Sequence, residues 1–112
     1  MTREFREAMR LMRKRDPQQQ EDGFHQLLPH AAEHLDELIQ QFEHEQDDHG
    51  LRCWLLELIA AARSPAALPI LAAQLNGPDE SLPSRAAVGL SKLDTPEART
   101  LLWQARADGM IA

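Results

Sequence analysis

The sequence DHGLRCWLLELIAAARSPAALPIL at residues 48–71 decides the fold, because a diverged copy of it, DESLPSRAAVGLSKLDTPEARTLL, follows at residues 79–102. The two copies align without a gap when Asp48 is placed on Asp79, and apolar positions such as Ile59 and Leu90 then correspond. The offset from Asp48 to Asp79 is the repeat period of the sequence. Each copy predicts a turn, a helix, a tight turn and a second helix. Self-similarity at a fixed period of this kind is typical of helical repeat proteins.

A third, more diverged copy precedes these two. When this copy is shifted by one repeat period, its apolar side chains align with the core positions of the next copy. We expect these apolar residues to form the buried stripe of one helix: Phe24, Leu27, Leu28 and Ala31. Asp16-Pro17 predicts the start of that helix, because Asp caps the first turn and Pro has its backbone angle preset. Pro29 predicts a kink or an end, since it lacks an N–H and crowds the carbonyl four residues back.

The other helix boundaries follow from similar signals. Residues 2–14 predict an amphipathic first helix, and a helix of the first copy is expected to end near Gln46. Further helix starts are predicted where a capping residue precedes the first turn: Asp48 or Asp47, Ser64-Pro65, Asp79 and Thr95-Pro96. The expected core of the repeats is Leu55, Leu58, Ile59 and Leu90.

The sequence therefore predicts one all-α domain over residues 1–112, an α-solenoid of about seven short antiparallel helices in about three repeats. Each helical hairpin is too small to bury its own apolar face, so stacked neighbours supply the missing contacts. The predicted parts are a capping helix, a diverged repeat, two clear repeats and a tail: 1–15, 16–47, 48–78, 79–107 and 108–112.

Composition narrows the classes of protein that this chain fits. Cys53 is the only cysteine, which excludes an intrachain disulfide and a Cys-based metal site. No apolar run approaches the roughly 18 residues of a membrane span, so no membrane partner is expected. The N-terminal residues lack the apolar segment of a signal peptide, and a cytoplasmic location is expected.

Charge is divided into three zones. Residues 1–15 carry a net charge of +4, residues 16–51 carry −10 without a single Lys or Arg, and residues 52–112 are neutral, which gives −6 in all. A protein that binds duplex DNA usually presents a basic stripe, and the long middle zone is the opposite. We therefore expect another protein as the partner and no nucleic acid, with the charged zones steering the encounter.

Two segments of the repeats resemble a known family. The segment RAAVGLSKLDTPEA at residues 85–98 resembles the second helix and turn of a bacterial HEAT-like repeat, of the short kind named after phycobilin lyases. The segment SPAALPIL at residues 64–71 resembles the first helix of the next such repeat. The resemblance implies an α-solenoid whose usual work is protein–protein interaction.

The resemblance covers residues 48–107 well and residues 16–47 more weakly. Two residues depart from the repeat pattern. Trp54 occupies the position that Arg85 takes one repeat later, and Pro83 lies in the first turn of its helix.

A histidine motif suggests metal chemistry at first sight. His30, Glu33 and His34 spell H-x-x-E-H, a zinc-peptidase motif whose two histidines would share one face of a continuous helix. The inverzincins that carry this motif are far larger, and Ala31 within it belongs to the apolar register of the repeat. We interpret the cluster as solvated surface, with an adventitious divalent-ion site as the alternative.

No other pattern indicates catalysis: neither a Ser-His-Asp order nor a Gly-rich phosphate loop nor a pocket of paired carboxylates is distinguishable. We expect a chain that is not an enzyme and that needs no cofactor.

A partner-binding surface is predicted from helical wheels of residues 49–62 and 80–93. We expect the second helices of the repeats, residues 17–31, 49–62 and 80–93, to line one concave face. On that face, the side of each helix that lies opposite the core would be next to the corresponding side of the neighbouring helix. The candidate contacts combine cations with a modest apolar strip: Arg52, Leu56, Arg63, Arg85, Val88 and Lys92. Cys53 shares the strip with Leu56, and either the strip packs on a neighbouring helix or it is exposed for a partner. An acidic ridge is the alternative surface: Asp36, Glu37 and Glu43.

The sequence is compatible with three functions. The first is a non-enzymatic protein-interaction module, which could be an adaptor, a regulator or an immunity-type protein that masks a basic toxin. The second is an enzyme-associated role, bilin-lyase-like or DNA-glycosylase-like, borrowed from HEAT-like relatives. No aromatic cluster suggests a tetrapyrrole pocket, and the glycosylase mode needs a cationic groove. The third is an assembly of copies that stack through the open ends of the solenoid.

Overall fold

The computed structural model describes residues 2–77 and 81–111. Within those residues every regular element is a helix and no strand occurs, which confirms the predicted all-α class. The elements are, in chain order, α1 (Arg3–Met12), α2 (Pro17–Leu27), the 3₁₀ helix η1 (Leu28–His34), α3 (Leu35–His44), α4 (His49–Ala61), the 3₁₀ helix η2 (Pro65–Ala67), α5 (Leu68–Leu75), α6 (Ser81–Leu93) and α7 (Pro96–Ala107).

Side-chain caps begin several helices where the sequence predicts them. Each cap accepts a hydrogen bond from a backbone N–H of the first turn, which has no partner within its own helix. The confirmed caps are Asp16, Asp48, Ser64 and Thr95. The predicted cap Asp79, and with it the boundary between the repeats at residues 78 and 79, lies outside the described residues.

The turns that end α4 and α6 have the same backbone conformation. Arg63 and Asp94, which occupy equivalent positions in the two copies, both have φ of 50° in the left-handed region. The next residue in each turn is the hydroxyl cap of the following helix, Ser64 or Thr95. The period found in the sequence therefore recurs in the backbone of the two turns.

Pro29 ends α2, as predicted. The α-helix stops at Leu27, the chain continues as η1, and His30 has the non-helical angles φ −117° and ψ 16°. Leu28 is 39% exposed, so the expectation that it completes the buried stripe is wrong. Leu28 itself keeps helical angles, φ −53° and ψ −48°, and its N–H bonds to the Phe24 carbonyl, but it does not follow its repeat counterpart Ile59 into the core.

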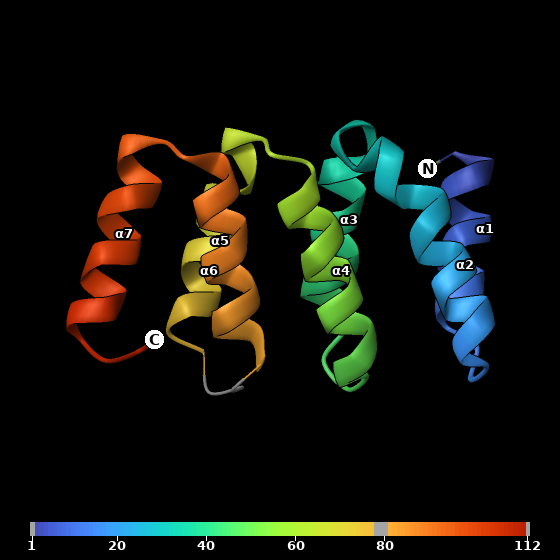
Figure 1. Ribbon diagram of the computed structural model, residues 1–112. Helices are drawn as coiled ribbons and strands as arrows, with labels where there is room; N and C mark the ends of the chain where they lie inside the picture. The colour runs from blue at the N-terminus through green and yellow to red at the C-terminus, as the bar shows by residue number, and fades with distance from the viewer. Residues whose placement is uncertain (1, 78–80, 112) are drawn as a thin grey trace.

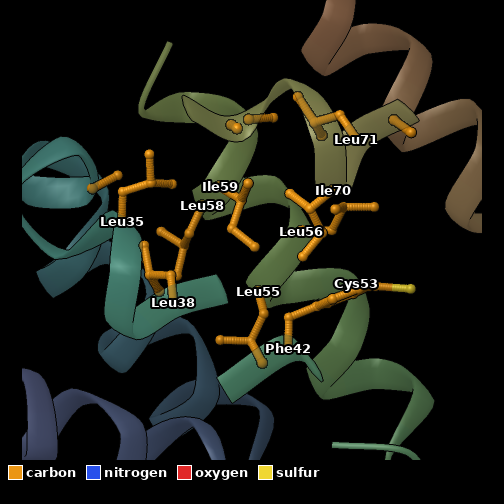
Figure 2. Close-up of a cluster of buried hydrophobic side chains, with 14 of the residues drawn as sticks. Leu35, Leu38, Phe42, Cys53, Leu55, Leu56, Leu58, Ile59, Ile70 and Leu71 are labelled. Atoms are coloured by element: carbon orange, nitrogen blue, oxygen red, sulfur yellow. The ribbon is translucent and has the colours of Figure 1, made fainter. Parts of the chain in front are cut away.

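One apolar core runs through the molecule, from Phe5 in α1 to Ala105 in α7. The predicted core residues are each 0% exposed, which confirms their predicted burial: Leu55, Leu58, Ile59 and Leu90. Figure 2 shows the part of this core in which side chains of α3, α4 and α5 meet.

The helices follow one another along the longest dimension of the molecule, which measures 41 × 25 × 21 Å. Helices α1 and α2 lie at one end and α7 at the other, and α2, α4 and α6 stand in a row in front of α3 and α5 (Figure 1). Helix α4 packs on α3 and on α6, so it is covered on two sides. Within the described residues no helix has the length and apolar character needed to cross a membrane.

The packing of α6 against α4 depends on a glycine. A Cβ placed on Gly89 would lie 2.9 Å from the Cβ of Ala60 and 3.0 Å from a methyl group of Leu71. Real Cβ atoms almost never approach as closely as the first distance, and the second is tighter than most real Cβ contacts, so Gly89 allows α6 to approach α4 and α5 as closely as it does.

Candidate functional site

The face formed by α2, α4 and α6 carries a groove of about 350 Å³. Residues from all three helices and the first residue of η1 line it: Phe24, Leu28, Glu57, Ala60, Ala61, Arg85, Val88 and Lys92. Val88 is 54% exposed and Leu28 39%, so two large apolar side chains are open to solvent beside the cations of Arg85 and Lys92. The structure thus brings three of the sequence-predicted contacts, Arg85, Val88 and Lys92, into one site.

Side-chain contacts join the neighbouring helices of this face. The ring of Trp54 on α4 lies 4.5 Å, centroid to centroid, from the ring of Phe24 on α2. The Nη1 of Arg85 on α6 donates a hydrogen bond to Glu57 Oε1 on α4 at 2.7 Å. An aromatic pair therefore connects α2 with α4, and an ion pair connects α4 with α6.

Arg85 contributes both a buried nitrogen and an ion pair to the groove. Its Nε is buried and has no hydrogen-bond partner among the described residues. The pKa of its guanidinium is raised above the usual value, first by the neighbouring Cys53 side chain and further by the charge of Glu57, while burial acts in the opposite direction. Arg85 therefore stays charged and is positioned between two hollows of the same face.

The second hollow, of about 420 Å³, lies between the beginnings of α4 and α6. It shares Glu57 and Arg85 with the groove and is otherwise lined by His49, Gly50, Cys53, Trp54 and Ser81.

Three side chains of this hollow are in mutual contact. The Cys53 Sγ lies 3.5 Å from His49 Nε2 and 3.5 Å from Ser81 Oγ, and the latter two atoms are 2.9 Å apart. A thiol, an imidazole and a hydroxyl thus meet at the wall of a hollow that contains a guanidinium.

The sequence reasoning did not identify this cluster as a site. Its only sequence signal is the spacing of His49 and Cys53, which lie four residues apart and so share one face of a helix. Ser81 lies beside them because α6 packs on α4, and no local sequence pattern predicts that packing.

Leu56 is not part of a partner surface, and its prediction as an exposed contact is wrong. It is 0% exposed and belongs to the apolar core together with Ile70 and Leu71 of α5 (Figure 2). The strip that Leu56 shares with Cys53 packs on neighbouring helices, which was the first of the two interpretations left open.

Arg52 and Arg63 are absent from the groove lining. The Nη1 of Arg52 donates to the carbonyl oxygens of Phe42, at 2.8 Å, and of Glu45, and its guanidinium lies 4.0 Å from the centre of the Phe42 ring. Arg52 therefore satisfies carbonyl groups at the end of α3. Arg63 is exposed in the turn that follows α4.

The acidic ridge lies on α3, a helix that contributes nothing to the groove. Asp36 and Glu43 are exposed, while Glu37 is half-buried and its Oε2 lies 3.1 Å from Nδ1 of His34. Glu43 instead borders a separate hollow between α3, α4 and α5. The ridge is therefore a surface distinct from the groove.

The histidine motif does not form the face that a zinc peptidase needs, because η1 is not an α-helix. His30 is exposed and pairs with Glu33 at 3.3 Å, whereas His34 is 8% exposed and its ring lies 5.3 Å from the ring of Phe5. Among the described residues no group of three or more His, Cys, Asp or Glu side chains is placed to hold a metal ion.

Comparison with known proteins does not add to this geometry. No protein-family model, curated protein or solved structure matches the chain.

Proposed function

We propose that the chain is a short HEAT-like α-solenoid of three repeats that works as a non-enzymatic protein-interaction module, and that it binds its partner across the face of α2, α4 and α6. The observation that carries this proposal is the exposure of Val88 and Leu28 in a groove that also presents Arg85 and Lys92. Interface centres favour this mixture, in which apolar side chains and arginine anchor the contact.

The solenoid is supported by features that recur after one repeat period. The left-handed residues Arg63 and Asp94 end α4 and α6, and the hydroxyl caps Ser64 and Thr95 follow them. Trp54 and Arg85, also one period apart, each contact the preceding helix of the same face. Repeating units that contact mainly their neighbours are typical of solenoids.

The groove fits an acidic, amphipathic segment, most simply one face of a helix. Its apolar side chains would cover Val88 and Leu28, and its carboxylates would approach Lys92 and Arg85. Covering the exposed half of Val88 contributes on the order of 1 kcal/mol of transfer free energy. Most of the affinity must therefore come from the partner's side chains that fill the groove and from the charged rim.

A second candidate is an immunity-type role in which the acidic ridge masks a basic effector. The exposure of Asp36 and Glu43 on α3 favours it, because a basic partner would meet two solvent-facing carboxylates there. The two candidates use different helices and opposite charges, so they can be separated by mutation.

The test measures the Kd of a partner purified after affinity capture from the native host. Val88→Glu with Lys92→Glu is compared with Asp36→Lys with Glu43→Lys, and circular dichroism checks that both variants fold. The groove variant is expected to weaken binding at least tenfold, about 1.4 kcal/mol, and the ridge variant by less than about twofold. The reverse order would overturn the groove proposal and favour the ridge.

A further inference from the structure

The side of α1 that points away from the core carries a row of arginines. Because residues three and four apart are neighbours on a helix surface, these arginines form one basic stripe along α1 and its C-cap: Arg3, Arg6, Arg10 and Arg13. All of them are exposed, whereas the apolar residues of α1, such as Phe5 and Met12, are buried. The basic stripe therefore faces solvent.

Helix α3 lies beside α1 and runs in the same direction. Where the two helices begin, the rings of Phe5 and His34 are 5.3 Å apart. Where they end, Arg13 donates hydrogen bonds to Gln41 and Glu45, both at 2.9 Å. These contacts join residues that are about equally far along their helices, so α1 and α3 are aligned without a large shift.

The acidic ridge on α3 matches the basic stripe in spacing and in level. Asp36 and Glu43 are exposed and lie about two turns apart on one side of α3. Arg6 and Arg13 have the same spacing. The alignment of the two helices places Arg6 level with Asp36. It places Arg13 level with Glu43, since Arg13 contacts the residues two before and two after Glu43.

The stripe and the ridge point the same way. Helix α1 packs on α2, and α3 packs on α4. Helices α2 and α4 stand in front of α3 in Figure 1. The sides of α1 and α3 that turn away from α2 and α4 therefore form one surface, which is basic along α1 and acidic along α3.

The two halves of this surface carry equal and opposite charge. Residues 3–14 hold five cations and two carboxylates, a net +3, and residues 35–44 hold three carboxylates and no Lys or Arg, a net −3. Some of these charges are paired within the chain, Arg10 with Glu7 at 2.6 Å and Arg13 with Glu45 at 2.9 Å. Within residues 2–77 and 81–111, Arg6 and the two exposed carboxylates of the ridge form no ion pair.

We propose that this surface binds a second copy of the chain in a symmetric dimer. Its two-fold axis runs parallel to α1 and α3, so α1 of each copy lies on α3 of the other without a shift along the helices. The basic stripe of each copy then meets the acidic ridge of the other, and the contact of Arg6 with Asp36 occurs twice. The dimer goes beyond the proposed partner binding and leaves the groove of α2, α4 and α6 free.

Two other occupants fit the surface less well. A nucleic acid that bound the stripe would bring its phosphates against the carboxylates of the ridge. A membrane-bound amphipathic helix needs exposed apolar side chains beside its cations, and those of α1 are buried in the core. A second copy, in contrast, supplies the opposite charge at every level of the surface.

The first experiment is sedimentation equilibrium of the full chain at concentrations up to about 1 mM, at which a dimer with a millimolar Kd is still detected. A weak dimer is expected, because exposed ion pairs are individually weak. Raising NaCl from about 0.1 M to about 1 M shortens the Debye length from about 10 Å to about 3 Å and should raise the Kd at least tenfold. A chain that stays monomeric at low salt would overturn the proposal, and so would an open series of larger assemblies.

Charge reversal then identifies the surface. Arg6→Glu places two carboxylates opposite each other at both contacts, and Asp36→Arg places two cations there. Each variant alone should therefore have a Kd at least tenfold higher than that of the parent chain. In an equal mixture the new carboxylate of one variant faces the new guanidinium of the other, and the second contact keeps its native pair. Native mass spectrometry, which separates the species by mass, should show the mixed dimer in preference to either homodimer.

Glu97→Arg and Arg106→Glu reverse exposed charges on α7 and are the matched controls. Neither should change the Kd, and their mixture should show no preference for the mixed dimer. Circular dichroism checks that each variant folds. If Asp36→Arg does not fold, Asp36→Asn removes the charge and should by itself weaken the dimer.

Two results would contradict the proposal. The first is a mixture of the α1 and α3 variants without preference for the mixed dimer, which would place the contact on another face. The second is a chain that stays monomeric but binds duplex DNA or phosphatidylserine vesicles, with binding lost in Arg6→Glu, which would assign the basic stripe to phosphate groups.

Discussion

Trp54 and Arg85 occupy equivalent positions one repeat period apart, and each reaches back to the preceding helix of the same face. The Trp54 ring lies 4.5 Å from the ring of Phe24, and Arg85 Nη1 lies 2.7 Å from Glu57 Oε1. The same position of the repeat therefore contributes a contact to both helix–helix boundaries of the face, which are called its seams. The contact is apolar in the α2–α4 seam and charged in the α4–α6 seam.

These two seams are expected to differ in their contribution to stability. Trp54→Ala should lower the free energy of unfolding by roughly 1–3 kcal/mol, because a half-buried ring loses apolar contacts and its aromatic partner. Arg85→Ala should cost less than about 1 kcal/mol, since both members of its ion pair are more than one-third exposed. Urea unfolding of both variants checks the order, and a larger loss for Arg85→Ala would contradict it.

The core register is tested at Leu90. Leu90→Ala should lower the free energy of unfolding by on the order of 2–5 kcal/mol, through lost transfer free energy and the cavity left behind. Leu28→Ala is the matched control, because Leu28 is the same residue type at 39% exposure, and it should cost less than about 1 kcal/mol. Equal losses at the two sites would show that the register is wrong.

The left-handed turn after α4 is tested at Arg63, whose φ is 50°. Arg63→Gly should raise the free energy of unfolding by about 0.5–1 kcal/mol, because glycine adopts this conformation without the steric cost of a Cβ. Arg63→Ala removes the same side chain but keeps the Cβ, so it should give no such gain. A thermal or urea melt in which Ala stabilises as much as Gly would attribute the effect to the lost charge.

Much of the fold could be predicted because its signals are local. Helix starts could be predicted from capping residues that bond only to their sequence neighbours, as Asp16, Ser64 and Thr95 do. The core leucines could be predicted from the repeat period. The errors lie where packing between helices decides. A helical wheel with one core side exposes Leu56, but α4 is a central helix that is covered on two sides. Leu28 follows the repeat pattern in sequence and keeps helical angles, yet it is 39% exposed, because burial depends on which helices pack over a side chain.

The candidate site could be predicted only in part, for the same reason. Arg85, Val88 and Lys92 face solvent on one side of one helix, so a wheel of that helix finds them. The cluster of His49, Cys53 and Ser81 exists only because α6 packs on α4. The periodicity of the sequence does not predict a contact between residues of two different helices.

A pH dependence is expected from Glu45 in the turn between α3 and α4. Its pKa is lowered below the usual value, first by a hydrogen bond from the backbone N–H of Asp48 and then by Arg13. These bonds measure 3.1 Å and 2.9 Å. Because the folded chain binds this proton less tightly than the unfolded chain, the interaction stabilises the fold at neutral pH. That contribution is lost as the pH falls through the folded pKa of Glu45.

Glu45→Gln keeps the shape of the side chain and removes its charge. It should therefore be less stable than the parent chain at neutral pH, and the two should converge in acid. Glu43→Gln, at an exposed position in the last turn of α3, serves as the control and should change little at either pH. A Glu45→Gln deficit that persists unchanged in acid would exclude the charge of Glu45 as its cause.

Hydrogen exchange of the backbone amides, measured on the chain alone and in complex with its purified partner, tests the central claim most directly. If the face of α2, α4 and α6 holds the partner, exchange should slow in residues 24–28, 57–61 and 85–92 and stay unchanged in residues 36–43. Protection confined to residues 36–43, with the groove segments exchanging as in the free chain, would contradict the account.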